Sequence, residues 1–328
     1  MKTPLLKVAA LVLLCAVVYL NSCKEEPTMN PLDELPDEQL LNVPTYDGSG
    51  QCVHPDILFM EPRSNGYRYV MAFTPYPYFD DKLENPSLVH SNNGVDFTEV
   101  MSGMNPLAKA PQYDHNDDPD LRYDPVTGKY YLYYLETMRP DSQNVIVLES
   151  TDGLTFTKHT AVHFDLTAGD PFILSPAVIR QPDGHGYRMY FVYPVNPYRV
   201  QYIYSADGEH WDKHAIKDIE TDLQSPYHPW HMDVIHSPKG YAMLCNCIGS
   251  PIQPFNQVLM LGTSTDGDHW HFQEQPLMVS DPHFHGCRYV YRSTGLWFQN
   301  KLAVWYSMVD TNSRWMIGIK KFDTDTIL

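Results

Sequence analysis

A seven-residue pattern occurs four times in the chain and constrains the fold more than any other feature. Each copy starts with serine, carries Asp-Gly or Asn-Gly in its middle and ends in an aromatic residue; the copies are Ser91–Phe97, Ser150–Phe156, Ser205–Trp211 and Ser264–Trp270. Asp-Gly and Asn-Gly between apolar runs are typical of tight β-hairpins. Successive copies start 59, 55 and 59 residues apart. That length suits four short strands with their turns, so the sequence predicts an all-β protein with the β-propeller fold.

Strand-forming runs between the copies indicate five blades. The second unit has candidate strands near 120–123, 129–134, 144–149 and 155–159, and other units open near residues 54, 175, 231 and 287. The fifth unit stops one strand short, which would leave an open sheet edge. Propellers protect such an edge with a strand from the other end of the chain, so we expect residues 41–46 to complete the last blade.

The N-terminus has the features of a lipoprotein signal. Lys2 and Lys7 precede an apolar run of about 13 residues, and the run ends in Leu20-Asn-Ser-Cys23, which resembles a bacterial lipobox. An ordinary secretory signal or a transmembrane helix is the alternative, but the run is short for a membrane span. We expect a signal peptide over 1–22, lipid on Cys23, an acidic flexible tether over 23–44 and the propeller over 45–328.

Lys24-Glu-Glu-Pro follows Cys23, and acidic residues just after the lipidated cysteine resemble those of surface lipoproteins of Bacteroidetes. This resemblance implies an outer-membrane lipoprotein that faces the periplasm or the cell surface. The lipid would then be the chain's contact with the membrane.

The charge of the chain narrows the class of partner. The formal net charge is −17, and loss of residues 1–22 removes two lysines and no acids, which gives −19. Nucleic acids and anionic membrane surfaces are poor partners for so acidic a protein. Aromatic residues make up 13% of the chain. Most would fill the space between blades, but such side chains also stack on sugar rings, so a neutral oligosaccharide or polysaccharide is the expected partner.

Two pairs of cysteines remain after the signal. Cys52 and Cys287 precede the inner strands of the first and last blades, so they are candidates for a disulfide bond in an exported protein. Cys245 and Cys247 stand two apart in one strand, where buried apolar side chains are a better interpretation than a metal site.

Inner strands of a propeller surround a central funnel, and carboxylates stand where several of them begin. The residues at the five predicted strand starts are Asp56, Asp120, Ser175, Asp233 and Arg288. Three carboxylates around one axis repel one another, so a structural role alone explains them poorly. Their sequence neighbours add imidazoles, a carboxylate and a flat aromatic ring suited to sugar: His54, Asp118, Trp230 and His231.

These motifs resemble the five-bladed propeller glycosidases of glycoside hydrolase family 43 and its relatives, including family 117. The resemblance covers about residues 50–323 and rests on the strand-start aspartates and on runs such as Asp120-Leu-Arg-Tyr-Asp-Pro. It implies that Asp56 is a general base and that Asp120 orients the substrate. The family's general acid, a glutamate opening the third blade, is missing here, where Leu174-Ser175-Pro176-Ala177 stands instead.

The missing glutamate leaves the proton donor and the activity open. Candidate donors are Glu84, Asp233, Glu136 and His231, the last because family 117 uses histidine as its acid. One hypothesis is a glycosidase acting on neutral glycans; the other is a catalytically silent propeller that binds glycan. The sialidase family has a related repeat, but its arginine cluster has no counterpart beyond Arg288 and Arg292. Calcium would also suit the carboxylates of the funnel.

Overall fold

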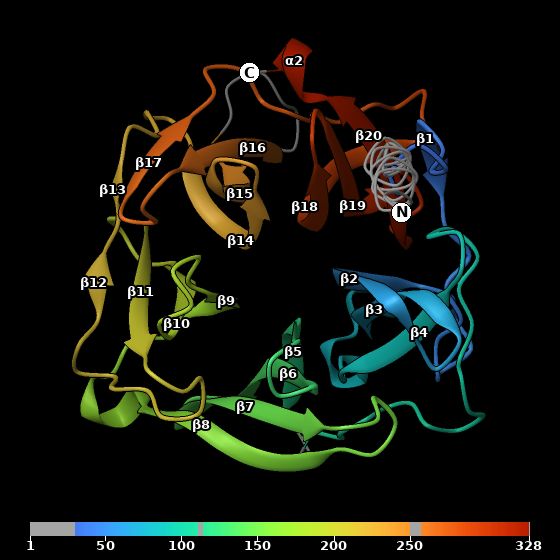
Figure 1. Ribbon diagram of the computed structural model, residues 1–328. Helices are drawn as coiled ribbons and strands as arrows, with labels where there is room; N and C mark the ends of the chain where they lie inside the picture. The colour runs from blue at the N-terminus through green and yellow to red at the C-terminus, as the bar shows by residue number, and fades with distance from the viewer. Residues whose placement is uncertain (1–29, 111–113, 250–256, 328) are drawn as a thin grey trace, which may run out of the picture.

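Five sheets stand around a central axis in the computed structural model, which describes residues 30–110, 114–249 and 257–327 (Figure 1). The inner strand of each sheet lies nearest the axis. The predicted all-β fold with five blades is confirmed. Within the described ranges the helices are single short turns: η1 (Pro77–Phe79), η2 (Asp81–Leu83), η3 (Leu166–Ala168) and α2 (Thr324–Ile327).

Each blade is an antiparallel meander that runs outward from the axis. The inner strands are β2 (Cys52–Ser64), β5 (His115–Asp124), β9 (Leu174–Arg180), β14 (His228–Ser237) and β18 (Cys287–Phe298). The second strands are β3 (Tyr67–Pro75), β6 (Lys129–Met138), β10 (Tyr187–Tyr193), β15 (Gly240–Ile248) and β19 (Lys301–Asp310). The third strands are β4 (Ser87–Ser91), β7 (Ser142–Ser150), β11 (Arg199–Ser205), β16 (Gln257–Ser264) and β20 (Trp315–Asp323).

The outer strands are shorter and less regular. They are β8 (Thr157–Asp165), β12 (Lys217–Asp218), β17 (His269–Phe272) and, in the last blade, β1 (Glu38–Leu40), while β13 (Glu220–Thr221) adds a parallel pair to β17. In the first blade the fourth position is a single bridge between His90 and Thr98.

The repeated motif forms the hairpin that links the third and outer strands. In the second copy the Ser150 Oγ accepts the Gly153 N–H at 2.9 Å, and Asp152 Oδ1 accepts two N–H groups at 2.8 Å each. Gly153 has a φ of 70°, which a side chain would strain. Asn93 takes the place of the aspartate in the first copy and makes the same kind of bonds. The motif is therefore a structural turn.

The N-terminal segment closes the ring, as expected, but the pairing strand lies slightly earlier than residues 41–46. Glu38 and Leu40 of β1 pair with Lys320 and Gly318 of β20. Leu35 is 3% exposed and packs in the same core as Trp305, so the predicted tether is already part of the propeller from residue 30 onward. The predicted signal peptide and Cys23 lie outside the described residues.

Apolar cores fill the space between neighbouring sheets, where most of the aromatic residues lie. Trp270, Tyr190 and Met243 pack between the third and fourth blades, for example. The four cysteines of the described residues are buried and free, so the predicted disulfide between Cys52 and Cys287 is wrong. No helix in the described ranges is both long and apolar enough to span a membrane.

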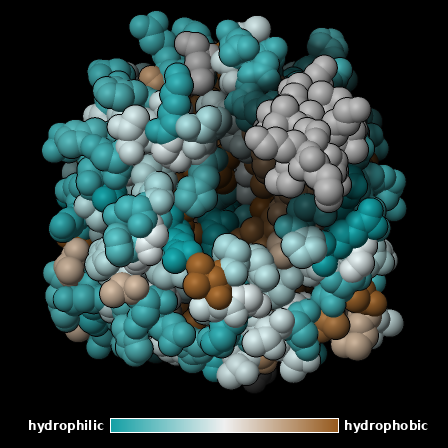
Figure 2. Space-filling view, in the orientation of Figure 1, coloured by the Kyte–Doolittle hydropathy of each residue, from teal (hydrophilic) through white to brown (hydrophobic). Residues whose placement is uncertain are grey.

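The face drawn in Figure 2 is hollowed near the axis of the ring. A cavity of about 370 Å³ opens at the axis and is lined mainly by apolar residues of the inner strands, such as Ile57, Val178 and Val234, with Arg122 among them. Residues 54, 118 and 231, which precede the lining residues on the same strands, do not line this cavity.

The repeat predicts a pH dependence of stability. The N–H groups of Thr155 and Leu154 lower the pKa of the exposed Asp152 from 3.8 to about 2. Because the folded pKa is the lower one, this carboxylate stabilises the fold above about pH 4 and loses that effect as the pH falls toward 2.

Asp152→Asn reproduces the residue of the first copy without its charge. We expect the variant to lose at most about 1 kcal/mol at pH 7, since solvent screens the exposed group. The difference in free energy of unfolding should shrink at pH 3, as measured by urea titration. A difference that stays constant with pH would contradict the assignment.

Candidate functional site

In three successive inner strands, a left-handed residue before proline and a β-bulge direct one side chain toward the axis. His54, Asp118 and Ser175 each precede a proline and have φ values of 56°, 50° and 52°. A β-bulge interrupts the pairing of the strand at each of these places. Left-handed backbone is strained for such residues, and bulges re-aim side chains near active sites. This combination turns these three side chains toward the axis.

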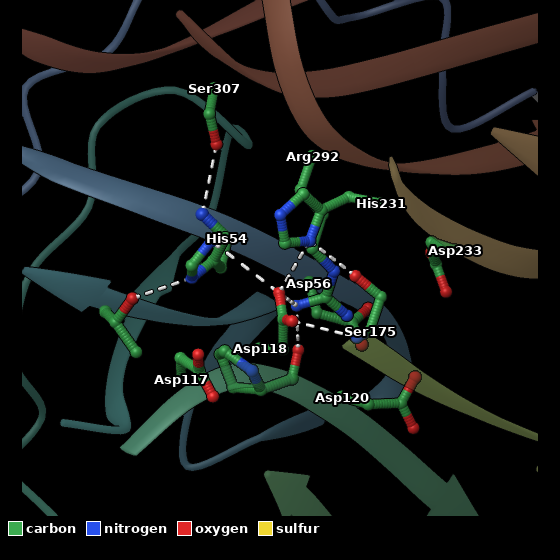
Figure 3. Close-up of polar contacts among 12 residues, drawn as sticks. His54, Asp56, Asp117, Asp118, Asp120, Ser175, His231, Asp233, Arg292 and Ser307 are labelled. Carbon is green, nitrogen blue, oxygen red and sulfur yellow. Dashed lines mark hydrogen bonds and ion pairs between the residues drawn. The ribbon is translucent and has the colours of Figure 1, made fainter. Parts of the chain in front are cut away.

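His54, Asp118 and His231 form a compact buried cluster (Figure 3). Asp118 Oδ1 lies 3.2 Å from His231 Nδ1 and 3.6 Å from His54 Nε2. Their side chains are at most 4% exposed. One ligand atom from each of the three residues lies within 4.8 Å of the others, which is a separation that a single ion could bridge.

Neighbouring side chains hold both imidazole rings in place. Ser175 Oγ lies 2.7 Å from His231 Nδ1, and Tyr291 Oη lies 2.5 Å from His231 Nε2. The His54 ring contacts Thr74 Oγ1 at 3.1 Å through Nδ1. A partner on one ring nitrogen fixes the orientation and the tautomer of a histidine, so His54 Nε2 is left facing the cluster.

The electrostatics favour a neutral His54 beside an ionised Asp118. Burial lowers the pKa of His54 to about 3, although Asp118 opposes the shift. Burial by itself would raise the pKa of Asp118, but His231, His54 and Arg292 together hold it below its usual range. At neutral pH the pair therefore presents an imidazole lone pair and a carboxylate, both of which can bind a cation.

Two atoms of this cluster lack a hydrogen-bond partner among the described residues. They are His54 Nε2 and Asp118 Oδ1, and both are buried. Leaving such atoms unpaired costs free energy, so an unpaired pair that faces a common point indicates a ligand. Two imidazoles and a carboxylate are a common ligand set for a catalytic divalent cation. His54 Nε2 and Asp118 Oδ1 are therefore free to bind a divalent cation, and His231 would join them by exchanging its contact with Ser175 or Tyr291 for the cation.

A second acidic cluster borders the first. It consists of Glu84, His115 and Asp117, each of which has one possible ligand atom within 4.8 Å of those of the other two. Glu84 Oε1 is 3.7 Å from His54 Nδ1. Burial, followed by the charges of Asp117, Asp118 and Asp81, raises the pKa of Glu84 well above its usual value. A buried carboxyl whose pKa is raised in this way is a candidate proton donor.

The three predicted strand-start aspartates also lie close together, two residues further along each strand than His54, Asp118 and His231. Asp56, Asp120 and Asp233 are 0% exposed and surround the Arg122 guanidinium, at 3.4, 2.5 and 3.1 Å. Burial raises the pKa of Asp56 to about 6 in spite of Arg122. Their oxygens are largely occupied by protein hydrogen bonds: Asp56 Oδ2 accepts the Leu121 N–H at 2.7 Å.

The structure corrects the alignment of the blades at the strand starts. Ser175 corresponds to His54 and Asp118, not to Asp56, and Ala177 takes the position of the deeper aspartates. In the last blade Tyr291 contacts the cluster, whereas Arg288 lies three residues earlier in β18. The shared proline is the signal that would have given the correct alignment.

Two other predicted residues take different places. Trp230 is partly buried with its ring 5.9 Å from that of His231, so it borders the cluster as expected. Glu136 binds Lys158 Nζ at 2.6 Å and Asn144, and it belongs to none of the three clusters. The sequence does not predict a role for His115, Asp117, Arg122 and Tyr291, although Asp117 and Arg122 stand beside the strand-start aspartates of the second blade.

Comparison with known proteins identifies a relative whose name describes an enzyme that acts on a glycan. The chain is 27% identical over 324 residues to an A type blood N-acetyl-α-D-galactosamine deacetylase of Flavonifractor plautii, in an alignment covering 80% of the chain and 41% of the relative. The chain thus spans less than half of that protein. No family model matches the sequence.

Solved structures confirm the fold. An N-acetylgalactosamine deacetylase from F. plautii, in complex with blood group B trisaccharide, superposes with a TM-score of 0.77 at 21% identity over 88% of this chain and 96% of that one. A thermostable family-43 glycoside hydrolase gives 0.60 at 14% identity over 82% and 88%. The expected likeness to the five-bladed propellers of family 43 is therefore confirmed at the level of the fold.

The geometry predicts one tightly bound divalent cation per chain. Asp118→Asn should weaken binding of Zn²⁺ or Mn²⁺ by about 100-fold or more, and Ser175→Ala by about 10- to 100-fold, because the serine only orients His231. Calorimetric titration of chelator-treated protein measures both. His210→Ala, at a side chain 85% exposed, is the control. Equal affinity in the wild type and Asp118→Asn would overturn the cation site.

Proposed function

We propose that this chain hydrolyses the acetamido group of an amino sugar within a neutral glycan, releasing acetate and a free amine. The observation that carries the proposal is the pair of unpartnered buried atoms, His54 Nε2 and Asp118 Oδ1, beside His231. The named activity of the F. plautii relative supports the same reaction, since it is a sugar deacetylase of the same fold.

The residues of the site suit amide hydrolysis. In this reaction water attacks the acetyl carbon, and the leaving nitrogen gains a proton. A divalent cation at His54, Asp118 and His231 would supply a Lewis acid and a more acidic water. Glu84, a buried carboxyl 3.7 Å from His54, is placed to take the proton from the water and to give it to the nitrogen.

Hydrolysis of a glycosidic bond is the second candidate. The family-43 likeness of the fold favours it, and so does the raised pKa of Glu84, since a general acid must hold its proton at the working pH. We rank it second because Asp56 and Asp120, the expected base and orienting residue, are already bound to Arg122 and to backbone N–H groups, whereas His54 Nε2 and Asp118 Oδ1 have no such partner. A propeller that binds glycan without cleaving it remains the third outcome.

Product analysis separates these candidates. Wild-type protein supplied with a divalent cation should release acetate from neutral oligosaccharides that carry an N-acetylated sugar, with the chain length of the glycan unchanged by mass spectrometry. Glu84→Gln should reduce the rate by about 10²- to 10⁴-fold.

Glu136→Gln is the matched control for that variant, because it changes a buried glutamate outside the site. Shortened glycans without acetate would establish the glycosidase instead. Binding with neither product would establish the silent propeller.

We further propose that the protein is an outer-membrane lipoprotein anchored through Cys23. The support is the Leu20-Asn-Ser-Cys23 sequence after a short apolar run. Mass spectrometry of membrane-extracted protein should find a lipidated N-terminal peptide beginning at Cys23. An unmodified Cys23, or a mature chain that keeps residues 1–22, would contradict the anchor.

A further inference from the structure

A short segment after β3 carries two consecutive aromatic residues in a strained backbone. Tyr78 and Phe79 have φ values of 51° and 67°. Left-handed backbone is strained at a bulky residue that is not glycine, and such strain is concentrated at functional sites. Two adjacent residues of this kind need a compensating role.

Packing within the fold supplies only part of that role, because the Phe79 ring contacts Tyr76 and Trp315. Tyr78 is 64% exposed and Phe79 is 43% exposed, so the strain directs large aromatic surface toward solvent. Each would be less costly as a small polar residue or as glycine. The exposed rings are therefore better explained by something that they bind.

The segment adjoins the candidate site. The Phe79 ring lies 5.2 Å from Trp315, whose ring lies 5.2 Å from Tyr291. Tyr291 in turn contacts His231 of the cation cluster, with ring centroids 4.5 Å apart. Aromatic side chains thus lead without interruption from the exposed segment to the candidate site.

The other end of the same loop enters the site directly. After Phe79 the chain passes through η2, which Asp80 caps by accepting the Lys82 N–H, and reaches the buried Glu84. Tyr76, at the start of the loop, has its pKa raised by burial and by the charge of Glu84. One loop therefore carries both the proton-transfer residue and the exposed rings.

We infer that Tyr78 and Phe79 form a second sugar-binding subsite, next to the sugar that reacts at the His54–Asp118–His231 cluster. This inference rests on the proposed function and makes the substrate an oligosaccharide, not a free monosaccharide. Apolar faces of sugar rings stack on aromatic side chains. The exposed Asp80 and Asp81 beside the rings can accept bonds from sugar hydroxyls and repel carboxylate-bearing sugars, so the subsite selects a neutral ring.

Binding measurements on paired ligands test the subsite. The probes are a neutral trisaccharide with a terminal N-acetylhexosamine and the methyl glycoside of that sugar alone. Titration calorimetry on the Glu84→Gln protein avoids turnover of the ligand. The trisaccharide should bind more tightly, and added Tyr78→Ala and Phe79→Ala substitutions should together weaken it about tenfold while leaving the monosaccharide unchanged.

Three variants separate stacking from loss of structure. Phe79→Tyr keeps a ring and should keep the affinity, and Tyr204→Ala, at an exposed tyrosine in β11, should have no effect. Tyr78→Gly should weaken the trisaccharide without lowering the melting temperature, because glycine relieves the left-handed strain. A structural role would instead lower the melting temperature along with the affinity.

The outcomes distinguish this inference from the proposed reaction. Equal affinity for both ligands, or a trisaccharide preference that survives the double alanine variant, would overturn the subsite. A preference that the variants abolish, in a protein that releases no acetate, would support the subsite and refute the deacetylase. Acetate release with equal KM for both ligands would support the deacetylase and refute the subsite.

Discussion

Carboxylates tie neighbouring inner strands to one another across the gaps between blades, and the arrangement at the axis depends on them. Asp56 Oδ2 accepts the Leu121 N–H of the second blade, and Asp120 Oδ2 accepts the Val178 N–H of the third. Asp118 Oδ2 repeats the pattern nearer the site by accepting the Ser175 N–H at 2.8 Å. Inner strands have no ladder partner on the axial side, so these bonds satisfy backbone groups that would otherwise be buried without a partner.

Such ties bring negative charge into a buried space, and arginines balance it. Arg122 contacts three aspartates, and its pKa is raised above the usual value by their charges against the effect of burial. Removing one member of a buried ionic group typically costs about 3–5 kcal/mol. Arg122 also lines the axial cavity, so one residue both neutralises the three aspartates and forms part of the cavity wall.

The sequence predicted the propeller because its hairpin motif needs no tertiary context: Ser150, Asp152 and Gly153 make their bonds within the turn. It also predicted that Asp56, Asp120 and Asp233 meet at the axis. The sequence did not predict that His54 and Asp118, and not Asp56 and Asp120, form the candidate site. Their side chains reach it through a bulge and a left-handed residue, which depend on the neighbouring strand. Tyr291 and His115 come from segments whose approach to the axis only the folded ring determines.

In the first two blades, the left-handed residue before proline belongs to the candidate site, and the aspartate after the proline binds the next blade. The blades carry histidine, aspartate and serine in the first of these positions with nearly the same φ. Substitution of His54 changes what the axis can bind and leaves the ties through Asp56 and Asp120 in place, whereas Asp118 is itself a tie through the Ser175 N–H. In the first blade, the side chain that faces the axis can therefore change while the carboxylate that joins the blades stays the same.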